Sequence, residues 1–432
     1  MKFNKLALRP AIIFLAIILS FFASRFWVLN HPPAEYSDVK QDYERYANIW
    51  RYGLTPYLEH LYEYPPATIP VVYLPLELDQ RGIGKYYANY RAEIFVIESL
   101  MFMFVIVCLW KSAISKKHRV LALSYYLIAG MVAKDFWYEG IDLIFFGSIA
   151  CLLAWIRISD QKKFTHRVAT WTIFWFSVAV KLITFPLAVP IFLLTKIKKL
   201  QHEVLASVLG GAIVWGIPVL FFRSSLSVFI IFHAKRPLKF GAFGSYIIEL
   251  INDFAKTEQR VQVGPDYPMA GPVSAVVTKI VSILFLLAIS MFILWSWKVI
   301  RNFLKKNVKR NANTDFFIMI SLTLTYIFIF FLSSKTFSSP FHIWYVPLFA
   351  MYPFASLSSQ VFVYLSGVLL LLLDTTPHLK APAGVIFDTV PLYHLRDAFR
   401  FIPMIFLAVF FAQRLKLRRF PQERSSSKSL DS

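Results

Sequence analysis

Apolar runs and short polar loops alternate along most of this chain. Many of the runs approach or reach the roughly 17 to 25 residues that a helix needs to cross a bilayer. The pattern therefore predicts an all-α polytopic membrane protein with about twelve transmembrane helices. We expect these helices at residues 11–29, 93–110, 119–134, 141–157, 168–181, 184–195, 204–222, 273–297, 315–333, 341–356, 361–374 and 398–413. Thr184 and Pro186 interrupt the region around 168–195, so half-helices are an alternative there.

Basic residues are concentrated in every second loop. The clusters lie at residues 2–9, 111–119, 157–167, 196–199, 298–310 and 414–424. Because loops rich in lysine and arginine stay on the cytoplasmic side, we expect a cytoplasmic N-terminus and, after an even number of crossings, a cytoplasmic C-terminus. The same distribution accounts for the formal net charge of +21 without nucleic acid as a partner.

The composition indicates a single integral domain. The chain is 57% hydrophobic and 16% charged, and no soluble block of about 100 residues interrupts the apolar runs. We expect residues 1–413 to form this domain, with larger outer loops at 30–92 and 223–272. Residues 414–432 are basic and then polar, which is typical of a disordered cytoplasmic tail. The first apolar run exceeds the roughly 7 to 15 residues of a signal-peptide core, which favours an uncleaved anchor.

The first outer loop has its own helical pattern. Starting at Val39, apolar or aromatic residues follow at 43, 46, 47 and 50, which predicts a helix lying along the membrane surface. Gly53 and Pro56 supply its end. The stretch "YPPATIPVVYLPLEL" that follows is apolar but contains four prolines. A dipping or interfacial segment is therefore expected there, and not another crossing.

Acidic residues of this loop suit a general base. Asp38 would lie in the first turn of the surface helix, where the helix dipole favours an ionised carboxylate. Asp42 shares its face one turn later, and Glu63 could approach through the fold. A purely structural alternative is that Ser37 and Asp38 cap the helix.

Cationic residues near the outer side suit a phosphate. Lys181 precedes the break at Pro186 and would lie beside free helix ends, although snorkelling to the interface is an equal alternative. In "FHAKRPLKF", His233 and Arg236 belong to a basic group on the side that should be poor in positive charge, either as an anion site or as a solvated cluster. His342 lies among aromatic residues in "SSPFHIWYVPL", where it would contact a phosphate or anchor at the interface.

Familiar enzyme motifs are absent. The sequence contains no P-loop, HExxH, GxSxG or strict DxD motif. The two cysteines lie in apolar runs without a CxxC spacing. We therefore expect neither a disulfide, a metal site nor a cofactor.

The quoted segments resemble a known family, the GT-C membrane glycosyltransferases, and specifically the polyprenol-phosphate-mannose-dependent group classed as glycosyltransferase family 87. In the first outer loop the matching residues are Ser37-Asp38, Tyr43, Gly53, Pro56-Tyr57 and Glu63-Tyr64-Pro65-Pro66. Three further segments match in the same order: "AVKLITFP" with Lys181, "FHAKRPLKF" and "SSPFHIWYVPL". The chain departs from the family pattern at Lys239 to Ser245 and at Glu139-Gly140-Ile141-Asp142.

The resemblance implies a GT-C-like bundle whose outer first loop carries interfacial helices. It implies transfer of a hexose, with mannose as the expected sugar, from a polyprenyl-phosphate sugar to a lipid or glycan acceptor on the outer side of a bacterial plasma membrane, with inversion. Asp38 would be the base, with Asp42 in reserve. The expected contacts to the donor phosphate are Lys181, His233, Arg236 and His342, and the expected contacts to the sugar are Tyr36, Glu63 and Tyr64. These cations would replace a metal, so the only cofactor-like molecule is the lipid-linked donor.

Two other classes of protein remain open at this stage. A transporter or flippase for a lipid-linked or anionic solute would use Lys181 and Arg236 to bind cargo, and it would carry a polar path to the cytoplasmic side. A structural subunit would leave Asp38 as a helix cap. Convergence of Asp38 and Lys181 on the outer side, closed below, would favour the enzyme.

Overall fold

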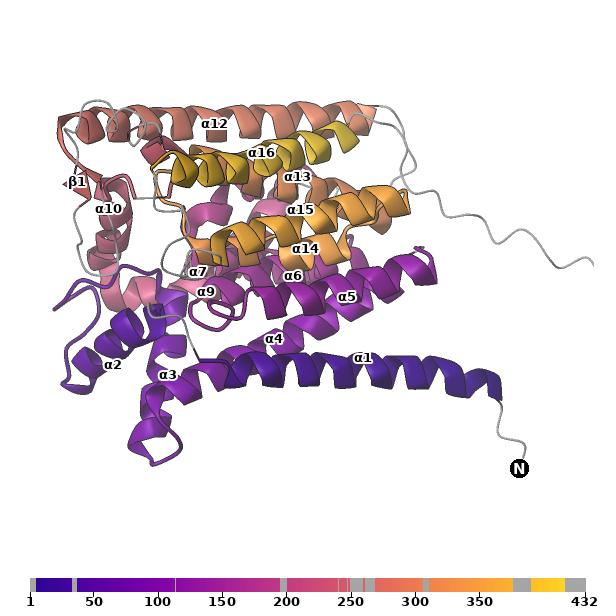
Figure 1. The fold of residues 1–432 in the computed structure, drawn as a ribbon, viewed down its shortest axis with the longest axis horizontal. Coiled ribbons are helices and arrows are strands. Elements are labelled where there is room, and N and C mark those ends of the chain that lie inside the picture. Colours follow the sequence, from indigo (N-terminus) through magenta and orange to yellow (C-terminus); the bar gives the residue numbers. More distant parts are fainter. Residues whose placement is uncertain are drawn as a thin grey trace, which may run out of the picture.

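The chain folds into a bundle of long helices that run side by side (Figure 1). The computed structural model describes residues 5–32, 37–112, 114–194, 200–239, 241–246, 248, 259–260, 269–305, 311–375 and 390–415. Residues 416–432 of the predicted C-terminal tail (414–432), and residues 249–258 and 261–268 of the predicted loop 223–272, therefore lie outside the described residues.

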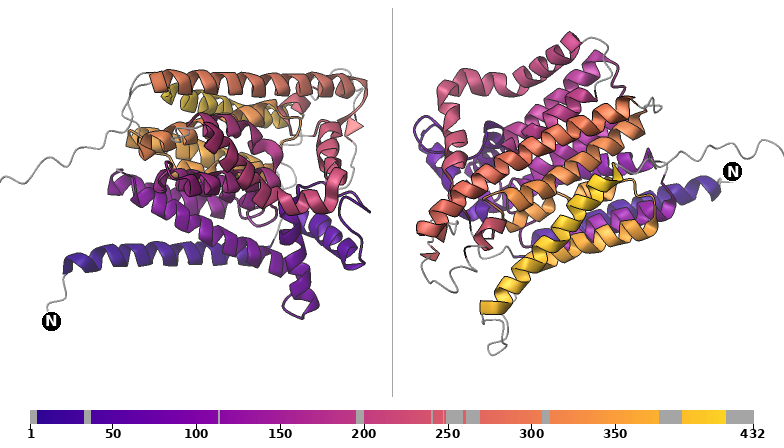
Figure 2. Two further views of the ribbon diagram at one scale, coloured as in Figure 1. Left: turned by 180° about the vertical axis from the view of Figure 1, so that it is seen from behind. Right: turned by 90° about the horizontal axis from the view of Figure 1, so that it is seen from above.

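Ten helices of 17 residues or more make up the bundle within the described residues. They are α1 (Lys5–Asn30), α4 (Tyr86–Trp110), α5 (Lys116–Val132), α6 (Asp142–Ile158), α7 (Phe164–Val180), α9 (Leu200–Phe222), α12 (Pro272–Lys305), α13 (Ala312–Ser333), α15 (Leu357–Thr375) and α16 (Val390–Arg414). Each coincides with one predicted crossing. Figures 1 and 2 show α1 along one side of the bundle, with α12 and α16 on the opposite side.

By length and apolar composition, five stretches of the described chain could cross a membrane. They are Ile12–Asn30, Tyr86–Trp110, Leu200–Lys235, Pro272–Lys305 and Ala312–Ser333. Large apolar side chains also cover the outside of the bundle, among them Ile217 on α9, 79% exposed, and Leu294 on α12, 70% exposed. An apolar exterior of this kind suits lipid and not water. The prediction of an all-α polytopic membrane protein is confirmed.

Two predicted crossings are interrupted. The first consists of the 3-10 turn η3 (Leu182–Leu187) and the six-residue helix α8 (Ala188–Leu193). The second consists of the 3-10 turn η5 (Ser339–Ile343) and the six-residue helix α14 (Val346–Met351). Neither helix is long enough to cross a bilayer alone, because a residue adds only about 1.5 Å. The expectation of half-helices around 168–195 thus applies to its second part, since α7 is continuous.

Contacts show that both interrupted segments still return the chain across the bundle. Arg167 of α7 pairs with Glu203 of α9, and Trp175 donates to the carbonyl of Ser207 at 3.0 Å. The helices α7 and α9 therefore run in the same direction, so η3 and α8, which lie between them in the chain, belong to a return pass.

The second interrupted segment also returns the chain across the bundle. The start of α13 meets the end of α6, where Arg157 donates to Asn313 at 2.9 Å. The start of α15 meets the start of α5, where Gln360 donates to the carbonyl of His118 at 2.9 Å. Both helices therefore start at the same end of the bundle, which we term the basic end because the basic clusters near Arg119 and Arg157 lie there.

Short elements gather at the other end, here termed the loop end. They are η1 (Val39–Tyr43), α2 (Glu44–Arg51), η2 (Pro66–Thr68), α3 (Ile69–Gln80), η4 (Arg223–Leu226), α10 (Ser227–Lys235) and the antiparallel two-residue strands β1 (Gln259–Arg260) and β2 (Met269–Ala270). Figure 1 shows α2, α3 and α10 here, with the N-terminus at the opposite end. The predicted surface helix and its interfacial successor correspond to η1 with α2 and to α3.

An aromatic contact fixes the first loop against the second. Tyr57 has a φ of 65°, in the left-handed region that ordinary residues seldom occupy. Its ring packs 5.0 Å from Phe222 at the end of α9 and 6.0 Å from Phe229 in α10, and its hydroxyl donates to the carbonyl of Tyr64 at 2.5 Å. The two predicted outer loops are therefore one structural unit at the loop end.

Candidate functional site

Asp38 does not cap the helix that it starts. Its backbone is helical, with φ −56° and ψ −31°, and its side chain makes no capping hydrogen bond. The next five residues form a π-helical turn, a rare form that is frequent at functional sites. Ser37 directs its hydroxyl to Glu139. The capping alternative is therefore wrong for both residues, and the carboxylate of Asp38 is left for other contacts.

Glu139 holds the start of the first loop in place through several polar contacts. Besides Ser37, its carboxylate accepts a hydrogen bond from Tyr87 at 2.6 Å and pairs with Arg91 at 3.2 Å. Arg91 in turn donates to backbone carbonyls at the end of α1, including that of Val28 at 2.9 Å. Since these partners belong to α1, α4 and the turn before α6, the position of Asp38 is set by the bundle itself.

Asp38 and Asp142 face one another across Gly140. A Cβ added to Gly140 would lie 3.3 Å from Oδ2 of Asp142 and 3.8 Å from Oδ2 of Asp38. It would also lie 3.7 Å from the hydroxyl of Tyr43, which accepts a hydrogen bond from the backbone N–H of Ile141 at 3.3 Å. Three oxygen atoms thus line the space beside the α-carbon of Gly140.

Lys181 lies on the other side of Asp142. Its backbone is extended between α7 and η3, and its Nζ lies 2.5 Å from Oδ1 of Asp142. The same oxygen accepts the indole N–H of Trp344 at 2.6 Å. The ammonium also lies 4.9 Å from the ring centroids of both Phe341 and Trp344, within cation–π range. The snorkelling alternative is therefore wrong, since Lys181 points to an acid and aromatic rings inside the protein.

The surroundings of Asp38 raise the pKa of its carboxyl group to about 7. Burial is the main cause, because it disfavours the charged form. The ammonium of Lys239 opposes this shift. Further upward contributions come from the negative charges of Asp142, Asp42 and Glu63. Asp38 is therefore close to half-ionised at neutral pH, the range in which a carboxylate is an effective base.

Further basic side chains adjoin this acidic group. His233 hydrogen-bonds the backbone of Glu63 and lies within electrostatic reach of Lys181, Arg236 and Lys335. The backbone N–H of Lys239 donates to the carbonyl of Lys335 at 2.9 Å, and the ammonium of Lys335 donates to the carbonyl of Ala234 at 2.7 Å. These hydrogen bonds join the end of α10 to the segment after α13, so the predicted basic group belongs to the same site as Asp38.

The remaining predicted residues have different positions. Asp42 is buried and pairs with Arg45 at 3.0 Å. Tyr64 packs 5.4 Å from the ring of Tyr43 and lies within electrostatic reach of Asp38. His342 is fully buried, with Nδ1 3.3 Å from the hydroxyl of Tyr345 and its ring edge-on to aromatic neighbours. Tyr36 lies outside the described residues.

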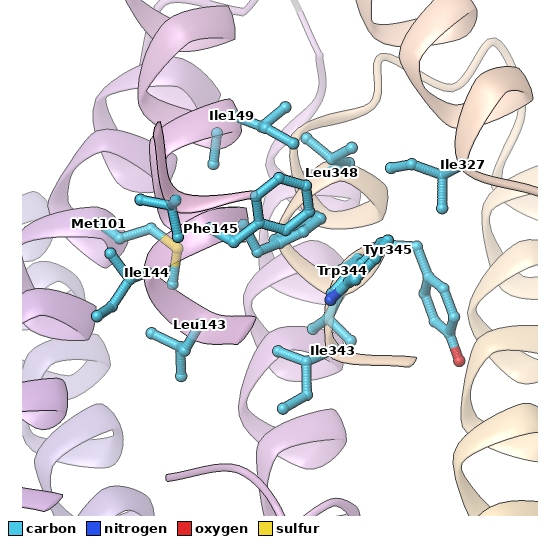
Figure 3. Close-up of a cluster of buried hydrophobic side chains, with 14 of the residues drawn as sticks. Met101, Leu143, Ile144, Phe145, Ile149, Ile327, Ile343, Trp344, Tyr345 and Leu348 are labelled. Carbon is cyan, nitrogen blue, oxygen red and sulfur yellow. The ribbon is translucent and has the colours of Figure 1, made fainter. Parts of the chain in front are cut away.

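Apolar side chains close the site towards the middle of the bundle. Figure 3 shows this floor, in which side chains of α4, α6, α13, η5 and α14 pack together. Phe145 packs 4.8 Å from the ring of Trp344, and Ile149 and Leu348 lie next to them, all buried. The charged groups thus gather at the loop end above a hydrophobic layer.

Sequence reasoning missed several residues of the site. Asp142 lies at the end of a predicted crossing, and Trp344 lies near His342 in "SSPFHIWYVPL", and neither of them is assigned to the site from the sequence. Tyr90 is also new. It is fully buried within electrostatic reach of Asp38 and Asp142, and its hydroxyl has no hydrogen-bond partner among the described residues. The departure from the family pattern at residues 139–142 was the available signal, because it marks where Glu139, Gly140 and Asp142 meet the first loop.

The fold and the site define a polytopic helical membrane protein with a mixed acidic and basic centre at one end. No family model matches the chain, and no curated protein matches it in sequence. Among solved structures it is similar to the crystal structure of ArnT from Cupriavidus metallidurans bound to undecaprenyl phosphate, with 12% identity and a TM-score of 0.44. The alignment covers 93% of this chain and 77% of that one. A likeness of this size carries no information about substrate or site.

Proposed function

We propose that this protein is a GT-C membrane glycosyltransferase, similar to family 87, that transfers a hexose from a polyprenyl-phosphate sugar to a lipid or glycan hydroxyl. Mannose is the proposed sugar, and the reaction takes place at the extracytoplasmic face of the plasma membrane. One observation carries the proposal. The carboxylate of Asp38 lies beside the pair formed by Asp142 and Lys181, at the same end of the bundle as the basic group around Arg236.

The chemistry needs one base and several cations. Asp38 takes the proton of the acceptor hydroxyl, whose oxygen attacks the anomeric carbon from the face opposite the phosphate. The bond between that carbon and the phosphate oxygen breaks, its electron pair leaves with the polyprenyl phosphate, and the configuration inverts. The proton remains on Asp38 until it passes to water.

Cationic side chains stabilise the departing phosphate. Lys181 and Arg236 both lie within electrostatic reach of His233, and their positive charges would balance charge that grows on the leaving group, with the imidazole of His233 as a hydrogen-bonding group beside them. His342 is assigned a supporting role here, behind the aromatic rings that surround Lys181. Glu63, Tyr64 and Tyr36 are assigned to the sugar, and the buried hydroxyl of Tyr90 supplies a further hydrogen-bonding group.

The apolar layer below the site argues against the alternative of a transporter. A transporter for an anionic solute needs a polar path between the two sides, and charged residues inside a membrane normally line such a path. Here Phe145 packs against Trp344, which donates to Asp142, and the buried side chains of Ile149 and Leu348 lie next to them. A site that is closed below and charged above suits a lipid donor that enters from the bilayer.

Glycosyl transfer by the purified protein in lipid vesicles tests the proposal. The donors are radiolabelled polyprenyl-phosphate-mannose and polyprenyl-phosphate-glucose, with a bacterial membrane lipid extract as acceptor. We expect wild-type protein to form a labelled product from the mannose donor, and Asp38→Asn to form none while still binding the donor. Asp160→Asn, which changes an exposed acid at the basic end, is the matched control.

Three results would contradict parts of this proposal. Full activity of Asp38→Asn would move the base to Asp42. Labelled product from the glucose donor alone would identify glucose, and not mannose, as the transferred sugar. Movement of intact labelled donor across the vesicle bilayer, with no product from a folded protein, would show that the protein is a flippase and not a glycosyltransferase.

A further inference from the structure

Asp142 lies between the proposed base and the proposed phosphate-binding lysine, and its two oxygen atoms face different partners. Oδ1 is 2.5 Å from Nζ of Lys181 and accepts the indole N–H of Trp344 at 2.6 Å. Oδ2 points to the space at Gly140, where the carboxylate of Asp38 and the hydroxyl of Tyr43 also point. No role in the transfer reaction described above belongs to this buried acid.

We propose that Asp142 is the positioning residue of the site: it holds the ammonium of Lys181 through one oxygen and places a second negative charge beside Asp38 through the other. The catalytic meaning of this inference rests on the proposed function. The electrostatic coupling of the two acids does not, and it can be measured without any substrate.

The first part follows from where Lys181 stands in the chain. It is the extended residue at which α7 ends and the interrupted pass begins, so the position of its side chain depends on tertiary contacts. The carboxylate of Asp142 supplies that fixation from the first turn of α6. Trp344, from the second interrupted pass, holds the same oxygen from another direction. A charge-assisted contact of this kind is shorter and stronger than a neutral hydrogen bond.

The second part follows from the charged and titratable groups that face Asp38. On its own element these are Asp42 and the hydroxyl of Tyr43, and on the rest of the first loop they are Glu63 and the hydroxyl of Tyr64. From other elements, the groups are Lys239 after α10, Tyr90 on α4 and Asp142 on α6. Among the acids that raise the pKa of Asp38, Asp142 has the largest effect. Because a like charge disfavours ionisation, neutral Asp142 would make Asp38 a weaker base.

Infrared difference spectroscopy of the protein in lipid nanodiscs, titrated with acid, measures this coupling. Subtraction of the Asp38→Asn spectrum isolates the protonated carboxyl band of Asp38. For the wild type we expect a titration midpoint near pH 7, in line with its pKa of about 7. For Asp142→Asn we expect the midpoint about one pH unit lower, because a negative charge is lost and Lys181 is released as an uncompensated cation.

A matched set of variants separates charge from structural damage. Glu77→Gln changes a partly exposed acid on α3 that pairs with Arg81, and it should leave the midpoint of Asp38 unchanged. Lys181→Met removes the counterion of Asp142 but keeps its negative charge, so the midpoint of Asp38 should not fall as it does in Asp142→Asn. If Asp142→Asn fails to fold, the double variant Asp142→Asn/Lys181→Met removes both charges, and a smaller downward shift is expected from it.

The outcomes distinguish this inference from the proposed function. An unchanged midpoint for Asp38 in folded Asp142→Asn or in the double variant would overturn the coupling, whatever the protein catalyses. A lower midpoint without any glycosyl transfer by the wild type would support the coupling while the proposed function fails. Where transfer is detected, the acidic limb of its pH profile should move to lower pH in Asp142→Asn by the same interval as the infrared midpoint.

Discussion

The indole of Trp344 donates to the carboxylate of Asp142 at 2.6 Å, although 202 positions separate the two residues in the sequence. This hydrogen bond ties the second interrupted pass to the first turn of α6. Lys181 ties the first interrupted pass to the same oxygen. Both breaks in the bundle therefore meet at one carboxylate. Irregular backbone at membrane depth is tolerated where it is buried or lines a cavity, and here it brings charged groups together at the loop end.

Activity should depend on the ionisation of Asp38. Its raised pKa, about 7, means that the ionised and active fraction falls as the pH drops through this value. We expect kcat/KM for glycosyl transfer to fall about tenfold per pH unit below pH 7 and to level off above it. The measurement is a pH profile with the donor well below saturation. A flat profile between about pH 5 and about pH 8 would exclude Asp38 as the base.

Lys181→Ala should weaken the complex with the donor. A hydrogen bond to a charged group contributes about 1.5 to 3 kcal/mol, so we expect the dissociation constant for polyprenyl phosphate to rise roughly 10- to 100-fold. Binding of a fluorescent polyprenyl phosphate to the protein in nanodiscs measures this change. Lys298→Ala, which alters an exposed lysine on α12, is the control. Unchanged affinity in a folded variant would limit Lys181 to its contacts with Asp142 and the aromatic rings.

The crossings could be predicted from the sequence because their signal is local. A long apolar run excludes water wherever it lies in the chain, and ten such runs correspond to single helices in the described residues. The two interrupted passes carried weaker signals, which were the break at Pro186 for the first and the proline and histidine of "SSPFHIWYVPL" for the second. Their positions were predicted, but the short helices α8 and α14 depend on packing inside the bundle.

The pairing of charges could not be predicted in the same way. Asp142 meets Lys181 and Trp344 only after three segments fold together, and no spacing in the sequence records that contact. The N-cap preference of serine also favoured a helix cap at Ser37, whereas the hydroxyl of Ser37 donates to the distant Glu139. Tertiary contacts thus decided the roles of these side chains, although their residue types had suggested where the site lies.

Gly140→Ala should separate the two acids without unfolding the protein. The added Cβ would lie 3.3 Å from Oδ2 of Asp142 and 3.8 Å from Oδ2 of Asp38, and Gly140 does not have a positive φ that would strain alanine. Oδ2 of Asp142 would have to give way by a few tenths of an ångström, whereas 3.8 Å to Asp38 is an ordinary van der Waals contact. Because a displacement of about 1 Å can cost roughly 100-fold in rate, we expect this smaller shift to lower transfer by roughly threefold to tenfold.

The control for this change is Gly216→Ala. Gly216 lies in α9, and a Cβ there would meet nothing within 4 Å. We expect its activity to equal that of the wild type and its thermal stability to be equal or slightly higher, because alanine favours the helix. Wild-type activity of Gly140→Ala would show that the space between the two acids is not used.

A last prediction concerns the ion pair that joins α1 to α4. Arg25 and Glu98 are fully buried 2.7 Å apart, and Glu98 also accepts the hydroxyl groups of Tyr126 and Tyr138. Because a buried charge without its partner is costly, Glu98→Leu should lower the free energy of unfolding by about 3 to 5 kcal/mol. The double variant Arg25→Met/Glu98→Leu removes both charges, so much of that loss should be recovered. Thermal unfolding in detergent, followed for both variants, measures the difference. Equal losses in the two would mean that packing around the tyrosines, and not the unpaired arginine, determines the cost.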